Sequence, residues 1–221
     1  MKLIKITLVL MVLLISAIHS ISQGTTYISN LQNQPQTHTS VGSDSWMAAY
    51  FNTGSNTNGY ILNSIQLLMG NSTGSASGMV VSLYTLNVNG FVPETNLGTL
   101  SGTDPTSAGT YTFSSSSISL SPSSRYFIVL KSGTPVSTGA FTWGIGSGGF
   151  SVADGWSPGG SYIYSADGLN WLGYRPNPFQ YAINATAIPE PATTSLIAIG
   201  VITIGLCRRK TKRQDIESRA C

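Results

Sequence analysis

Short runs of β-forming residues, separated by turn residues, fill the stretch between two apolar ends of the chain. The longest of these runs are Tyr60–Met69, Met79–Val88 and Arg125–Leu130. Asn89-Gly90 and Asp167-Gly168 between them supply the positive φ angles that tight hairpins require. No part of this stretch has an apolar stripe with helical spacing, so the sequence predicts an all-β domain over residues 23–187.

The remaining predicted strands are Ser45–Phe51, Thr110–Phe113, Phe141–Ile145, Ser161–Tyr164, Asn170–Tyr174 and Phe179–Ala187. About nine short strands at this spacing indicate an antiparallel β-sandwich or jelly roll. The run Arg125–Leu130 is continuously apolar, which suits a strand buried on both faces. The domain contains no cysteine, so its hydrophobic core has to stabilise it without disulfides.

Charge is scarce in this chain. Charged residues make up only 9% of the sequence, against roughly 25% in ordinary soluble domains. Between Gly24 and Ala187 there are three basic residues against five acidic ones. No stripe of lysine and arginine is available to bind phosphates, which argues against a nucleic-acid partner.

The N-terminal residues 1–22 have the features of a secretory signal peptide. Lys2 and Lys5 form a basic start, and an apolar run follows them. Ser20 and Ser22 provide the small residues that precede a cleavage site. The alternatives are an uncleaved anchor or a buried helix, but the length and flanks of the run favour a cleaved signal that exports the chain.

The C-terminal part combines three features in residues 188–213. Pro189-Glu190-Pro191 holds the backbone extended, because proline is excluded from a helix interior. The uncharged segment Ala192–Cys207 is long enough for a short transmembrane helix. A basic cluster follows, which we expect to stay cytoplasmic and to leave the β domain outside. It consists of Arg208, Arg209, Lys210, Lys212 and Arg213.

This arrangement resembles the PEP-CTERM protein-sorting signal of Gram-negative bacteria that make exopolysaccharide. The resemblance implies that an exosortase-type membrane protease or transpeptidase recognises and processes the chain. The chain would then be a transient single-pass membrane protein, delivered to the cell surface or the extracellular matrix. Residues 214–221 would be a short cytoplasmic tail, which members of the family usually lack. A plain single-pass anchor is the alternative.

The β domain itself resembles the "choice-of-anchor" domains that bacteria couple to various surface anchors. The likeness spans Trp46 to Ala187 and includes Ala48-Ala49-Tyr50-Phe51, Gly59-Tyr60-Ile61-Leu62 and Tyr126-Phe127-Ile128-Val129-Leu130. It implies a β-sandwich carried to the surface and implies no activity.

Few residues of the β domain suggest catalysis. His38 follows a Gln/Thr-rich stretch and is better explained as a solvated loop residue than as a catalytic base. No His/Cys set for a metal site is present, and no cofactor is expected. Asp154 and Asp167 each precede glycine, which favours turns, with a calcium site as the alternative. Glu94 is predicted near a hairpin tip, and a glycosidase would need two carboxylates facing each other.

Aromatic residues crowd the last third of the domain, and most are expected in the core. The alternative is a glycan contact made by Trp156, Trp143 and Trp171. Residues Ser165–Trp171 also resemble the Asp-box hairpin of β-propeller sialidases, which is a folding device. The sequence thus predicts an exported, non-catalytic surface or matrix protein associated with exopolysaccharide or biofilm. The alternatives are a carbohydrate-binding module and, less favoured, a surface hydrolase.

Overall fold

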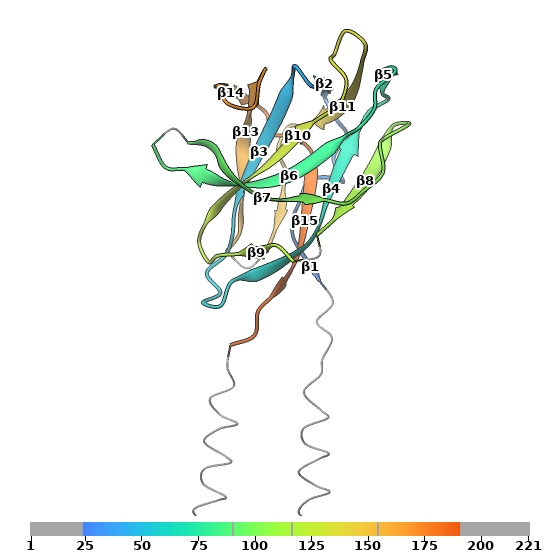
Figure 1. The fold of residues 1–221 in the computed structure, drawn as a ribbon. Coiled ribbons are helices and arrows are strands. Elements are labelled where there is room, and N and C mark those ends of the chain that lie inside the picture. The colour runs from blue at the N-terminus through green and yellow to red at the C-terminus, as the bar shows by residue number, and fades with distance from the viewer. Residues whose placement is uncertain (1–23, 90, 116, 154, 191–221) are drawn as a thin grey trace, which may run out of the picture. The chain divides into compact units, whose positions relative to one another are not determined.

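The computed structural model describes residues 24–89, 91–115, 117–153 and 155–190 (Figure 1). The strands are β1 (Thr25–Ser29), β2 (Thr37–Val41), β3 (Trp46–Asn52), β4 (Tyr60–Met69), β5 (Thr73–Gly74), β6 (Val80–Asn87), β7 (Val92–Leu100), β8 (Gly109–Ser114), β9 (Ser119–Leu120), β10 (Arg125–Lys131), β11 (Gly139–Ile145), β12 (Ser151–Val152), β13 (Ser157–Ser165), β14 (Trp171–Pro176) and β15 (Tyr181–Ala187). These residues contain no helix, which confirms the all-β prediction.

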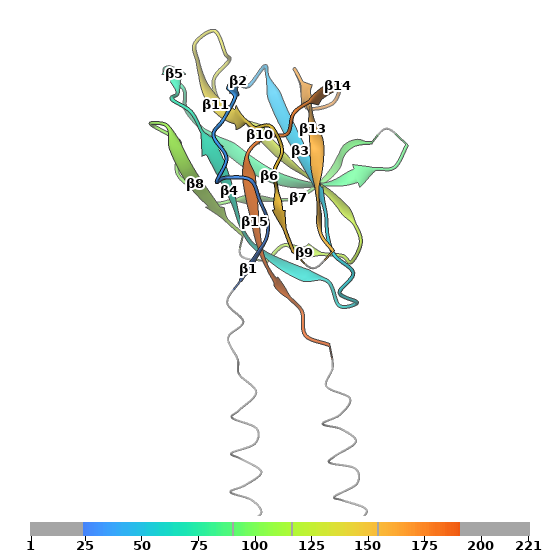
Figure 2. The same cartoon turned by 180° about the vertical axis from the view of Figure 1, so that it is seen from behind.

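The strands form two antiparallel sheets, seen from opposite sides in Figures 1 and 2. The larger sheet has the order β12-β1-β15-β4-β11-β2, with β5, β8 and β9 paired beside this path. The smaller sheet has the order β14-β13-β3-β10-β6-β7. One hydrophobic core contains side chains from both sheets, as a β-sandwich requires.

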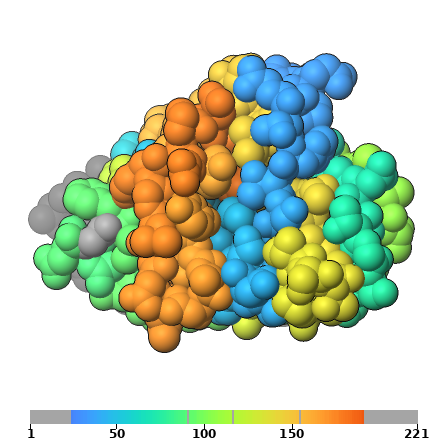
Figure 3. Space-filling model, turned by 90° about the horizontal axis from the view of Figure 1, so that it is seen from above, coloured from blue at the N-terminus to red at the C-terminus, as the bar shows by residue number. Residues whose placement is uncertain are grey.

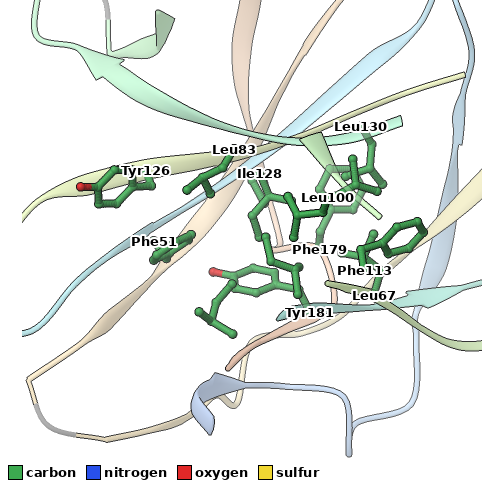
Figure 4. Packing of buried hydrophobic residues seen from close by; sticks show 14 of the residues in the cluster. Phe51, Leu67, Leu83, Leu100, Phe113, Tyr126, Ile128, Leu130, Phe179 and Tyr181 are labelled. Carbon is green, nitrogen blue, oxygen red and sulfur yellow. The ribbon is translucent and has the colours of Figure 1, made fainter. Parts of the chain in front are cut away.

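The core is built by alternate residues of the strands, because successive side chains of a strand point to opposite faces. On β4 of the larger sheet, Ile65, Leu67 and Met69 are buried. Figure 4 shows Leu67, Phe113 and Tyr181 of the larger sheet packed with Leu83, Ile128 and Leu130 of the smaller one. Both sheets therefore depend on the same core for most of their stability.

Strand β10 is buried on both faces, as its continuous apolar run predicts. Ile128 and Leu130 lie in the main core. Phe127 and Val129 point to the other face, where they join Ala48 and Ile163 in a second cluster. This outer cluster is covered by larger side chains from the same sheet: Trp46, Tyr50, Tyr84, Leu86, Val92 and Trp171.

The chain enters and leaves the β domain at the same end of the larger sheet. β1 and β15 are antiparallel neighbours, and Thr25 lies opposite Ala185. β15 is itself held between β1 and β4, where Ala187 lies opposite Tyr60. The last strand is therefore an interior strand of its sheet.

One expectation about local structure is wrong. His38 lies in β2, paired opposite Gly144 of β11, and not in a loop. β2 is at a sheet edge and rich in polar residues, so it lacks the apolar alternation that marks a half-buried strand. Glu94 lies in β7 directly after the turn that joins β6 to β7, which agrees with its predicted place near a hairpin tip.

The predicted signal peptide and the apolar segment before the basic cluster fall on residues outside those described. Among the residues that the structure does describe, no helix is long and apolar enough to cross a membrane.

Candidate functional site

The β domain continues up to the residue before the Pro-Glu-Pro sequence. The backbone N–H of Ile188 donates to the carbonyl oxygen of Gly59 at 3.0 Å. The carbonyl oxygen of Ile188 accepts a 3.1 Å hydrogen bond from Nδ2 of Asn56. Ile188 is thus held at both polar backbone groups, and the predicted sorting signal begins directly at the folded domain.

Of the predicted sorting residues, Pro189 and Glu190 are in the described part of the chain. Pro191 and the basic cluster lie outside it: Arg208, Arg209, Lys210, Lys212 and Arg213. The sequence prediction for these residues therefore remains a prediction.

Trp156 lies in the core and is only 3% exposed. Its ring stacks on Tyr27 at a centroid distance of 4.6 Å and on Phe51 at 5.8 Å. Tyr60 packs edge-on against the same ring. Since no face of the indole is open, this burial corrects the interpretation of Trp156 as a surface glycan contact.

Trp143 is completely buried as well. Its ring lies parallel to that of Phe179 at a centroid distance of 3.9 Å, and its Nε1 donates to the carbonyl oxygen of Gln180 at 2.9 Å. Trp171 is partly buried against the outer cluster. The three tryptophans therefore do not form a shared platform, and the interpretation of Trp143 as a glycan contact is also corrected.

The turn between β13 and β14 is organised by Asp167. Its Oδ1 accepts hydrogen bonds from the backbone N–H groups of Leu169 and Asn170, both at 2.8 Å. Ser165 donates its hydroxyl to the same oxygen at 2.9 Å. These donors stabilise the carboxylate and lower the pKa of Asp167 well below its ordinary value. The Asp-box-like sequence therefore serves the hairpin.

Two other carboxylates also bind backbone amides of distant loops. Asp104 accepts from the N–H groups of Gly78 and Met79 at 2.8 and 2.9 Å. Asp44 accepts from the N–H of Val136 at 2.9 Å. In the described ranges, no group of three or more His, Cys, Asp and Glu side chains comes together. Asp154 lies outside those ranges, so the calcium alternative stays a prediction.

The loops tied by Asp44 cover one end of the domain. Figure 3 shows the segment around β2 (blue), the loop after β10 (yellow) and the β13–β14 hairpin (orange) together at this end. The N–H of Ser43 donates to the carbonyl oxygen of Thr134 at 2.8 Å, which joins the first two segments. Trp46 lies against Gly168, which joins the β13–β14 hairpin to the other two segments.

The three cations of the β domain lie on aromatic rings, a feature that sequence reasoning missed. Cζ of Arg125 is 4.5 Å from the centroid of Tyr50, and Nζ of Lys131 is 4.5 Å from that of Trp46. Arg175 lies over Tyr164 at 5.4 Å. The sequence hides the first two pairs, because β3 and β10 become neighbours only in the folded sheet.

Comparison with known families identifies one segment of the chain. Residues 187–210 match the PEP-CTERM protein-sorting motif. No curated protein matches the chain. The match starts at the final residue of β15 and covers the Pro-Glu-Pro sequence, the apolar segment and the first basic residues. It describes how the chain is sorted and gives no activity to the β domain.

Proposed function

We propose that this chain is an exported, non-catalytic protein of the cell surface or extracellular matrix, processed at its C-terminal motif by an exosortase-type membrane enzyme. The observation that carries the proposal is the PEP-CTERM motif over residues 187–210. A sorting motif of this kind directs export and transient anchoring in the membrane. The β-sandwich is then the part that is delivered.

The junction between the domain and the motif supports this division of roles. β15 is an interior strand, and Ile188 still bonds to Gly59 and Asn56. A cut on the C-terminal side of Ile188 would therefore leave every strand of the domain in place. The domain would therefore stay folded after the motif is cleaved off.

The use of carboxylates in the domain supports a binding or structural role over hydrolysis. Asp44, Asp104 and Asp167 each accept hydrogen bonds from backbone N–H groups of loops. A glycosidase needs one carboxylate as acid and a second as base or nucleophile across a cleft. These three carboxylates instead hold loops together.

The sorting proposal is tested by fractionation of Gram-negative cells that contain an exosortase. In one variant Pro189, Glu190 and Pro191 are all replaced by alanine. The wild-type chain is expected as a shortened species at the surface or in the medium, and the variant as a full-length species in the membrane fraction.

A matched control replaces Asp215 and Glu217 by alanine, since these residues follow the matched segment. This control should be sorted like the wild type. The proposal fails if the wild type and the alanine triple variant accumulate in the same fraction at the same size.

A further inference from the structure

The cations and the carboxylates of the β domain are used differently. The described aspartates bind amides of the chain itself, as shown for Asp104 and Asp167. The three cations, in contrast, have no carboxylate partner among the described residues and lie on aromatic rings instead. A cation on a ring keeps most of its charge available to an external anion.

Arg125 has both a hydrogen-bond partner and two aromatic neighbours. Its Nε donates to Oδ1 of Asn52, the residue opposite it on β3, at 2.9 Å. This bond leaves the four N–H groups of the guanidinium end for another acceptor. Tyr50 lies two residues before Asn52 on the same face of β3, and Arg125 stacks over its ring.

Aromatic side chains from two other segments complete the surroundings of Arg125. Phe91, in the turn before β7, has its ring centroid 5.9 Å from Cζ of Arg125. Tyr174 of β14 donates its hydroxyl to the carbonyl oxygen of Phe91 at 2.8 Å. Burial raises the pKa of Tyr174, Tyr50 adds to this rise, and the charge of Arg125 opposes it.

The two added aromatic residues are open to solvent. Phe91 is 51% exposed and Tyr174 is 52% exposed. Phe91 also has a φ of +52°, a strained conformation for a bulky residue that has to be held by its surroundings. An exposed phenylalanine in a strained backbone has no role in the core, so its position beside Arg125 calls for another explanation.

The chemistry of this group suits one class of ligand. A guanidinium binds a carboxylate through two parallel hydrogen bonds, and ring faces pack on the apolar face of a sugar. Arg125 is the cation that these rings surround, since Lys131 lies at the far end of β10, roughly 20 Å away along the strand, and Arg175 lies over Tyr164 instead. Polymers with dense phosphates or sulfates need several adjacent cations, which this group lacks.

We propose that Arg125, Tyr50, Phe91 and Tyr174 form a binding site for a carboxylated sugar unit of an acidic polysaccharide. Arg125 binds the carboxylate, and the rings of Phe91 and Tyr174 contact the sugar. The site belongs to the β domain alone, so it goes beyond the sorting proposal and does not depend on processing at the motif.

The test uses the full-length chain purified from membranes in a non-ionic detergent. The probe is polygalacturonate, and the matched neutral probe is fully methyl-esterified pectin, which has the same sugars without the charge. Binding to polygalacturonate is expected and binding to the esterified polymer is not, as measured by calorimetry at fixed ionic strength.

Arg125→Gln should weaken binding at least about tenfold, the effect of losing one charge-assisted contact. Arg125→Lys keeps the charge but loses the paired donors, so it should weaken binding by a smaller factor. Lys131→Gln is the matched control, since it removes a cation that also lies on an aromatic ring but at the far end of β10, and it should bind like the wild type.

Several results would overturn the proposal: equal binding to both polymers, unchanged affinity in Arg125→Gln, or tighter binding to heparin or DNA than to polygalacturonate. Circular dichroism checks that Arg125→Gln is folded. If it is not, Arg125→Lys decides the question, and an affinity equal to that of the wild type contradicts the proposed site.

Discussion

The hydroxyl of Tyr181 donates a 3.0 Å hydrogen bond to the carbonyl oxygen of Tyr50. Tyr181 belongs to β15 of the larger sheet and Tyr50 to β3 of the smaller one, so the bond crosses the core. Opposite Tyr50 the register of β13 shifts between Pro158 and Tyr162, and the tyrosine hydroxyl bonds to the carbonyl at that irregularity. Complete burial raises the pKa of Tyr181 far above its ordinary value.

We expect Tyr181→Phe to lower the free energy of unfolding by about 1–3 kcal/mol, because the partly buried carbonyl oxygen of Tyr50 then loses the tyrosine hydroxyl as a donor. The measurement is urea denaturation followed by tryptophan fluorescence. Tyr162→Phe is the control, since the hydroxyl of Tyr162 makes no hydrogen bond to any described residue, and it should change stability by less than about 0.5 kcal/mol. Equal effects of the two substitutions would contradict the role of the cross-sheet bond.

Gly168→Ala should destabilise the domain much more than Gly155→Ala. Both glycines have a positive φ, +75° at Gly168 and +73° at Gly155, so both substitutions carry the same backbone strain. A Cβ at Gly168 would lie 2.5 Å from the ring of Trp46, whereas one at Gly155 would meet no atom within 4 Å. We expect a cost of about 1–2 kcal/mol at Gly155 and a further 1–3 kcal/mol at Gly168, measured by thermal unfolding.

The ring of Trp46 has little freedom to move away from a new Cβ. Its Nε1 donates to the carbonyl oxygen of Ser43 at 2.9 Å, and Lys131 covers the ring. If the two glycine variants unfold at the same temperature, the close approach between Gly168 and Trp46 is not a constraint in solution.

The β13–β14 hairpin should lose stability in acid because of Asp167. Its pKa is lowered in the folded state, so its stabilising effect is complete above the ordinary aspartate pKa of about 3.9. The effect is lost as the pH falls below that value toward the folded-state pKa. Hydrogen exchange of the amides of Leu169 and Asn170 should therefore become less protected between about pH 4 and pH 2.

Asp167→Asn should show weak protection of these two amides already at neutral pH, with little further change in acid. Asp44→Asn is the control, because Asp44 binds the amide of Val136 and not the hairpin. Acid-independent protection of Leu169 and Asn170 in the wild type would show that the carboxylate does not hold the turn.

Trp156→Ala should lower the free energy of unfolding by about 3–5 kcal/mol, as expected for removing a large buried ring. Trp156→Phe should cost about 1–2 kcal/mol, since it keeps an aromatic ring against Tyr27 and Phe51. It also removes the buried Nε1 that has no hydrogen-bond partner among the described residues. Urea denaturation of both variants measures the difference. An alanine variant with wild-type stability would contradict the burial of the ring.

The sequence predicts the strands that carry the core. The boundaries of Tyr60–Met69 agree with β4, and the double burial of β10 follows from its apolar run. Both strands are recognisable because the order of apolar residues along each strand reflects which of its faces are buried. The Asp167-Gly168 turn is predictable for a similar reason, since its chemistry is local to the hairpin.

Strand β2 and the surroundings of Arg125 are not predictable in this way. β2 contains Thr37, His38 and Thr39, whose polar side chains suit a sheet edge and a loop equally well. Arg125 meets Tyr50 and Phe91, and Phe91 meets Tyr174, only after three strands and a turn have come together. The sequence leaves a glycan alternative open for Trp156 and Trp143, because a residue type alone does not say whether its ring points into the core or to solvent.

The position of β15 between β1 and β4 would set an order of events in the export proposed above. The place between β1 and β4 is filled by residues 181–187, the last strand of the domain, which adjoins the sorting motif. In a chain exported N-terminus first, this strand would be the final part of the domain to cross the membrane. The sandwich would then close only when translocation reaches the motif, and an incompletely exported chain would remain an unfinished sheet.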